Sequence, residues 1–83
     1  MQYLKKRSFA LAGHKTSVAL EPAFWRLLEQ VAGERGLSLA ALVAEVDAGR
    51  AADGAPPLAS TLRLFALDQA LGRQHAEGVV VRR

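Results

Sequence analysis

The stretch Lys15-Thr16-Ser17-Val18-Ala19-Leu20-Glu21-Pro22 decides the fold of this chain. Apolar or β-branched residues alternate with small or polar ones as far as Leu20, which is the period of a half-buried strand. Glu21-Pro22 ends the strand, because proline suits the first turn of a helix. The alternation gives two faces: Thr16, Val18 and Leu20 toward a core, and Lys15, Ser17 and Ala19 outward.

A second alternation, Ser8-Phe9-Ala10-Leu11-Ala12, precedes this strand. Its large apolar residues stand at odd positions, so one continuous strand would place the two apolar sets on opposite faces. A turn or bulge at Gly13-His14 resolves the conflict, since glycine tolerates the backbone angles of such a break. We therefore predict two short strands. The first strand either lies beside the ribbon, where it could widen it or obstruct its outward face, or crosses to a partner chain.

Two amphipathic helices are predicted after Pro22. The first ends at Arg35, where Gly36 supplies the stop, and Ser38 is a good N-cap for the second. The second helix is expected to reach Gly49 or Arg50. Trp25, at the edge of the first stripe, is expected to pack between elements. The apolar stripes are Phe24, Leu27, Leu28, Val31 and Ala32, then Leu39, Leu42, Val43 and Val46.

The remaining sequence indicates a loop, a third helix and a tail. Asp53-Gly54 and Pro56-Pro57 mark the loop, and Ser60 and Gly72 are predicted to bound a helix over residues 61–71. Val79-Val80-Val81 stands in a polar tail and suggests either an edge strand or disorder. The expected organisation is a basic arm with an extra strand (1–14), a strand-helix-helix core (15–50), a loop and third helix (51–72), and the tail (73–83).

Positive charge is concentrated at the start of the chain. Residues 1–15 carry four basic residues and no acid, whereas residues 16–72 carry four arginines against seven acids. Two N-termini lying together in a dimer would form a patch suited to a polyanion. Basic ends can also serve solubility alone, so charge by itself leaves both interpretations open.

Chain length and composition predict a dimer and argue against an enzyme. A chain of 83 residues without cysteine has no disulfide to offset its small core, so a second copy is the expected support. His14 and His75 are isolated, which predicts neither a metal site nor a cofactor. No nucleophile with a base is apparent, and Glu45 and Asp47 are two residues apart and so do not share a helix face. No apolar run of membrane-spanning length exists, and we expect a cytoplasmic protein.

The order strand, helix, tight turn, helix over Lys15–Arg50 resembles the ribbon-helix-helix fold of Arc- and MetJ-type repressors. The Gly36-Leu37-Ser38 turn is similar to the junction of that family's two helices. Residues 6–21 resemble a proteobacterial branch of uncharacterised ribbon-helix-helix proteins. The fold expected is mainly helical, with a short antiparallel ribbon formed between two copies and a third C-terminal helix.

The resemblance implies a homodimeric transcriptional regulator, specifically a repressor, whose ribbon enters the major groove of double-stranded DNA. A two-stranded ribbon fits that groove, and helix N-termini can hold phosphates. Two alternatives stay open: an antitoxin-like module that binds another protein through residues 58–83, and non-specific nucleic-acid binding by the basic arm.

Three sets of residues follow from this interpretation. Lys15, Ser17 and Ala19 are predicted to face bases, and Lys5, Lys6, Arg7, Ser38 and Leu39 to lie near phosphates. The predicted dimer core consists of Thr16, Val18, Leu20, Phe24, Leu28, Leu42, Val43 and Val46.

Overall fold

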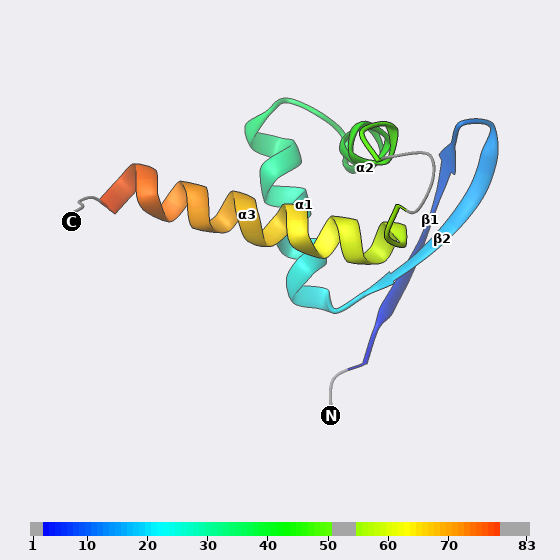
Figure 1. The fold of residues 1–83 in the computed structure, drawn as a ribbon, viewed down its shortest axis with the longest axis horizontal. Coiled ribbons are helices and arrows are strands. Elements are labelled where there is room, and N and C mark those ends of the chain that lie inside the picture. The colour runs from blue at the N-terminus through cyan, green and yellow to red at the C-terminus, as the bar shows by residue number, and fades with distance from the viewer. Residues whose placement is uncertain (1–2, 51–54, 79–83) are drawn as a thin grey trace.

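A two-stranded antiparallel ribbon and three helices make up the protein in a computed structural model that describes residues 3–50 and 55–78 (Figure 1). This architecture confirms the predicted fold class, mainly helical with a short ribbon and a third helix. The elements are β1 (Lys5–Leu11), β2 (His14–Leu20), α1 (Pro22–Glu34), α2 (Leu39–Ala48) and α3 (Leu58–Gly78).

Both strands of the ribbon come from one chain. β1 pairs with β2 along its whole length, from Lys5 opposite Leu20 to Leu11 opposite His14. Ala12 and Gly13 connect them with positive φ angles of 51° and 82°, which suits the tight turns of two-residue hairpins. The predicted break at Gly13 is therefore confirmed. β1 of the same chain occupies one edge of β2, so this ribbon forms within a single chain. The predicted pairing of residues 15–20 with a second copy would need the other edge of β2 and stays a prediction.

The predicted boundaries of α1 and α2 are confirmed to within a residue or two. α1 begins at Pro22 and ends before Gly36, whose φ of 70° allows Leu37 N–H to donate to the Ala32 carbonyl at 2.8 Å. This bond closes a Schellman turn. α2 begins after Ser38, whose Oγ accepts from the Ala41 amide at 3.0 Å. The turn fixes where α2 starts relative to α1.

α3 is longer at both ends than the sequence predicted. It begins at Leu58, and the Pro57 carbonyl accepts the first helical bond from Thr61 at 3.0 Å, so Ser60 is not the cap. Leu58 is buried, and its place in the core accounts for the extra turn. Gly72 does not end the helix. Glycine costs a helix only about 1 kcal/mol relative to alanine, so a helix can continue through it.

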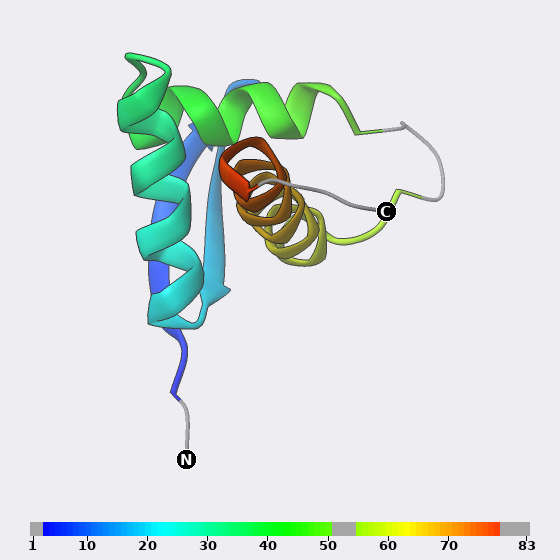
Figure 2. The same cartoon turned by 90° about the vertical axis from the view of Figure 1, so that its left-hand side faces the viewer.

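All three helices lie on one side of the hairpin (Figure 1, Figure 2). In Figure 2 the hairpin lies behind α1 and α2, and Figure 1 shows the hairpin from the side, with no helix beyond it. One hydrophobic core fills the space between these layers. Its buried residues are Phe9, Leu11, Val18, Leu20, Trp25, Leu28, Val31, Ala32, Leu42, Val43, Leu58, Leu62 and Ala66.

Candidate nucleic-acid interface

The pleat of the hairpin separates its side chains into two faces with different surroundings. Successive residues of a strand point to opposite sides, so the odd positions of β1 share a face with the even positions of β2. The inner face, toward the helices, buries Phe9, Leu11, Val18 and Leu20. The outer face carries six side chains: Lys6, Ser8, Ala10, Lys15, Ser17 and Ala19.

Trp25 fixes the inner face to α1. Its indole Nε1 donates to the Lys5 carbonyl at 2.8 Å, and its ring lies 5.9 Å from that of Phe9. The side chain is only 2% exposed. Its predicted packing role is thus confirmed, and the contacts hold the start of β1 against the helix. A buried indole usually needs such a partner for its N–H.

The outer face is open along both strands. Five of its side chains are exposed and Ala19 is half-buried. Ser8 lies opposite Ser17, and their Oγ atoms are 3.4 Å apart. The face therefore presents two lysines, two hydroxyls and two methyl groups on a rigid antiparallel ladder, with the hydroxyl pair at its centre.

The lysines of the hairpin differ from four arginines of the chain in their partners. Among the described residues, no acid lies within ion-pair distance of Lys5, Lys6 or Lys15. Four arginines, in contrast, pair with carboxylates: Arg7 with Glu29, Arg35 with Glu45, Arg50 with Asp47, and Arg63 with Glu21. Among the side chains that the structure describes, the cations outside these pairs are thus the three hairpin lysines and the exposed Arg26 of α1.

Arg7 belongs to the scaffold. Its Nη1 lies 2.7 Å from a Glu29 carboxylate oxygen, and its guanidinium carbon lies 5.1 Å from the centre of the Trp25 ring. It is at an odd position of β1 and so points toward the helices, away from the open face. Arg7 is therefore engaged within the chain, unlike Lys6 on the outer face.

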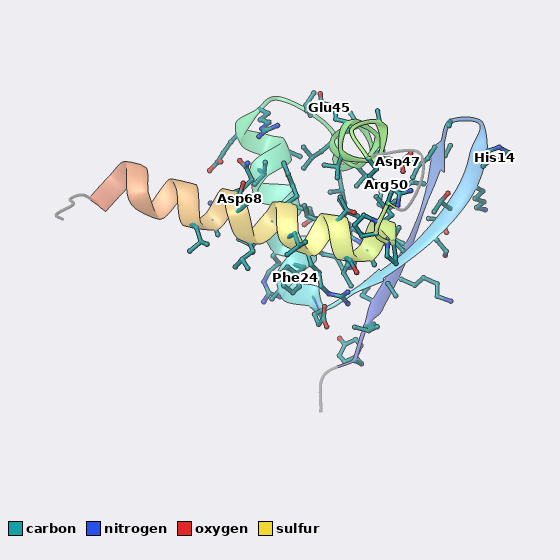
Figure 3. The ribbon with its side chains drawn as sticks, in the orientation of Figure 1. His14, Phe24, Glu45, Asp47, Arg50 and Asp68 are labelled. Carbon is teal, nitrogen blue, oxygen red and sulfur yellow. The ribbon has the colours of Figure 1, made fainter. Side chains whose placement is uncertain are left out.

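Of the other predicted phosphate contacts, Lys6 lies on the outer face, whereas Lys5, Ser38 and Leu39 lie outside it. Ser38 is exposed, and its hydroxyl is engaged in capping α2. Leu39 is half-buried against the core, so its contribution would be its backbone. Lys5 is exposed at the N-terminal end of β1. His14 is exposed where the hairpin turns (Figure 3).

The residues predicted as a dimer core line the interior of a single chain. Val18, Leu20, Leu28, Leu42 and Val43 are buried there, while Thr16, Phe24 and Val46 are half-buried. A strand partner within the chain supplies Phe9 and Leu11, two large side chains that the sequence interpretation had left outside the core.

A second surface lies between α2 and α3. A groove of about 710 Å³ is bordered by exposed Leu64, Leu67 and Leu71 of α3. Charged side chains around it include Arg35, Glu45, Arg50 and Asp68, and Figure 3 shows the last three around the two helices. This groove is apolar with a mixed-charge rim, unlike the purely basic ribbon.

Sequence analysis did not include Ser8 and Ala10 on this face, and it predicted Lys6 as a phosphate contact without placing it on the same face as Lys15. The strand carrying them was recognised, but its register was not. A recurrence could have revealed them: Lys-x-Ser-x-Ala begins at Lys6 and again at Lys15.

Within residues 3–50 and 55–78, no group of three or more histidine or acidic side chains could hold a metal ion. No helix in that part of the chain is long and apolar enough to cross a membrane.

Comparison with known proteins gives a consistent family. A family model described as a ribbon-helix-helix domain matches residues 4–70. The fold is also similar to the solved structure of an uncharacterized protein from Bordetella pertussis Tohama I, with a TM-score of 0.67 and 33% sequence identity. That match covers 93% of this chain and 66% of the Bordetella chain. No curated protein matches.

Proposed function

Since this chain belongs to the ribbon-helix-helix domain family, we propose that it is a homodimeric, cytoplasmic DNA-binding regulator whose ribbon enters the major groove. Domains of this family are in general DNA-binding regulators or antitoxins, on a regulatory and non-enzymatic fold. Repression is the regulatory outcome that we propose, since a protein seated in the groove would obstruct other proteins there. The homodimer remains part of the proposal because of the small size of the chain.

The observation that carries the proposal is the open outer face with its unpaired lysines. A two-stranded ribbon fits the major groove, where base edges present donors, acceptors and the thymine methyl. Lys6 and Lys15 can donate to guanine, and Ser8 and Ser17 can meet either class of base. Ala10 and Ala19 can make apolar contact with thymine. Lys5 and the N-terminus of α2 would then hold the backbone and set the register.

Selection of duplexes from a random pool at moderate salt tests this proposal. We expect an enriched motif, and a binding constant that falls steeply with salt as lysines displace counterions. Lys15→Ala should lower discrimination between the enriched and random duplexes by about 1–3 kcal/mol. Lys5→Ala should weaken binding to both duplexes alike and reduce the salt slope by about one.

Arg26→Ala is the charge-matched control. Arg26 is exposed on α1, and the helices lie on the opposite side of the hairpin from the outer face. Its removal changes the net charge by the same amount and should leave discrimination unchanged. A pool without enrichment, or discrimination that survives Lys15→Ala unaltered, would contradict base reading by the ribbon.

The leucines of α3 favour a second candidate, an antitoxin-like module that binds another protein. Leu64, Leu67 and Leu71 are each about half or more exposed and recur at helical spacing. An exposed apolar stripe with a polar rim is typical of a protein-interaction site. Val79–Val81, also considered for this role, lie outside the described residues.

Leu67→Glu separates the two functions. Since Leu67 is exposed, the substitution should leave the melting temperature and DNA binding within error of the parent. It should abolish co-purification of a partner from the source cell if α3 binds one. Retained co-purification, or none with the parent chain, counts against this candidate.

A further inference from the structure

The two strands of the hairpin repeat one another. Placing Lys5–Leu11 over His14–Leu20 aligns KKRSFAL with HKTSVAL. Identical residues then coincide at four positions: Lys6 with Lys15, Ser8 with Ser17, Ala10 with Ala19, and Leu11 with Leu20. At a fifth position Phe9 coincides with Val18, and both are buried.

The burial of the two strands follows the same repeat. In both strands the first five residues are in turn exposed, exposed, half-buried, exposed and buried, and the seventh residue is buried. The strands differ only at the sixth position, where Ala10 is exposed and Ala19 is half-buried. Equivalent positions of the two strands therefore share their degree of burial as well as their residue type.

Because the strands are antiparallel, their register relates the two copies of the repeat by an approximate two-fold axis. Ser8 lies opposite Ser17, and these two residues are equivalent in the repeat. Lys6 lies opposite Ala19, and Lys15 lies opposite Ala10. Rotation by half a turn about an axis through the serine pair thus exchanges the strands and superposes lysine on lysine and alanine on alanine.

We infer that one hairpin, by itself, reads a short inverted repeat in duplex DNA, with the axis between Ser8 and Ser17 placed on a local two-fold axis of the duplex. The inference rests on the proposed function and specifies its ligand. The two strands of a duplex are related by such an axis, so equivalent side chains meet equivalent bases in the two half-sites. Each half-site is read by one lysine, one serine and one alanine of a single strand.

The length of the ribbon sets the size of this site. Lys6 and Ala10 are four residues apart, which is roughly 13 Å along a strand at about 3.3 Å per residue. That length spans about four base-pair steps of 3.4 Å. The site should therefore be about four to six base pairs long, with guanine contacts near its two ends from Lys6 and Lys15.

A symmetric site can also arise from a homodimer, and single substitutions distinguish the two origins. In the proposed homodimer a substitution enters both hairpins, so symmetry between the two copies persists in every variant. Within the element of about four to six base pairs under one hairpin, Lys15→Ala alters only one half and Lys6→Ala alters the other. Each variant should then select an element without internal symmetry, and the two elements should be the same sequence read on opposite strands.

The experiment selects duplexes from a random pool with the full chain, Lys6→Ala, Lys15→Ala and the control Arg26→Ala. The full chain and the control should return an inverted repeat of about four to six base pairs for each hairpin that binds. Each lysine variant should keep one half of it and bind the symmetric duplex roughly 5- to 150-fold more weakly, by factors within about threefold of each other.

The outcomes separate this inference from the proposed function. A motif from the full chain that lacks two-fold symmetry overturns the inference and leaves DNA reading intact. An element of about four to six base pairs that keeps its internal symmetry with Lys15→Ala assigns that symmetry to the pairing of two copies and also overturns the inference. A pool with no enriched motif overturns the proposed function, and the inference with it. Circular dichroism of each variant establishes that it is folded.

Discussion

Alternate residues of the same two strands form the two faces of the hairpin, yet the inner face packs against the helices and the outer face does not. On the inner face, apolar side chains are buried and the cation Arg7 is bound to Glu29 and lies over Trp25. On the outer face, small side chains and two lysines stay exposed and without an acidic partner among the described residues. Lys6 and Arg7 are neighbours in the sequence, but their side chains point to opposite faces of the strand. This difference alone gives the two cations different surroundings.

The largest difference between the two faces is expected in the free energy of unfolding that their side chains contribute. Leu20 is fully buried, so Leu20→Ala should lower the free energy of unfolding by about 2–5 kcal/mol through lost burial and a residual cavity. Ser17→Ala on the outer face should change it by less than about 0.5 kcal/mol. Urea denaturation measures both, and equal losses would show that the outer face is also packed.

An intermediate effect is expected from the adjacent cations. Arg7→Ala removes a partly exposed ion pair and a cation–π contact, which together contribute about 1 kcal/mol to stability. Lys6→Ala should leave the free energy of unfolding unchanged but weaken DNA binding. In denaturation Arg7→Ala should lose stability and Lys6→Ala should not. In DNA titration Lys6→Ala should lose affinity and Arg7→Ala should not. Loss of DNA affinity with Arg7→Ala in a folded protein would contradict the assignment of Arg7 to the scaffold.

The smallest effect concerns Glu21, where the hairpin joins α1. A hydrogen bond from Arg63, 2.9 Å away, holds the pKa of Glu21 below its ordinary value of 4.5. Because the folded state favours the carboxylate, this pair stabilises the protein above pH 4.5 and the stabilisation is lost as the pH falls through the lowered pKa. Glu21→Gln should lower the melting temperature slightly at pH 7, and this difference should shrink as the pH falls below 4.5. A difference that stays constant across this pH range would assign the role to packing.

Local sequence patterns were sufficient to predict most of the fold. The alternation through Leu20, the proline at the start of α1 and the Gly36-Leu37-Ser38 turn each specify structure within a few residues. The start of α3 could not be predicted in this way, because Leu58 joins the helix by packing into a core built from distant segments. Pro56-Pro57 and Ser60 favoured a later start on local grounds.

Half of the candidate interface depended on a pairing that no local pattern specifies. Residues 15–20 need a strand partner, and sequence alone predicted a second copy in that place and left the position of the first strand open. Only the register, with Ser8 opposite Ser17, brings Lys6, Ser8 and Ala10 onto the same face as the predicted Lys15, Ser17 and Ala19. The recurrence of Lys-x-Ser-x-Ala was present in the sequence, but its meaning depends on that antiparallel pairing.

Titration of the ¹⁵N-labelled protein with its selected duplex tests the central claim most directly. Amide shifts should change first and most at Lys6, Ser8, Lys15 and Ser17, with smaller changes at the N-terminus of α2 and none along the exposed leucines of α3. Changes confined to α3, or an unperturbed hairpin in a saturated complex, would contradict the claim that the outer face of the ribbon reads DNA.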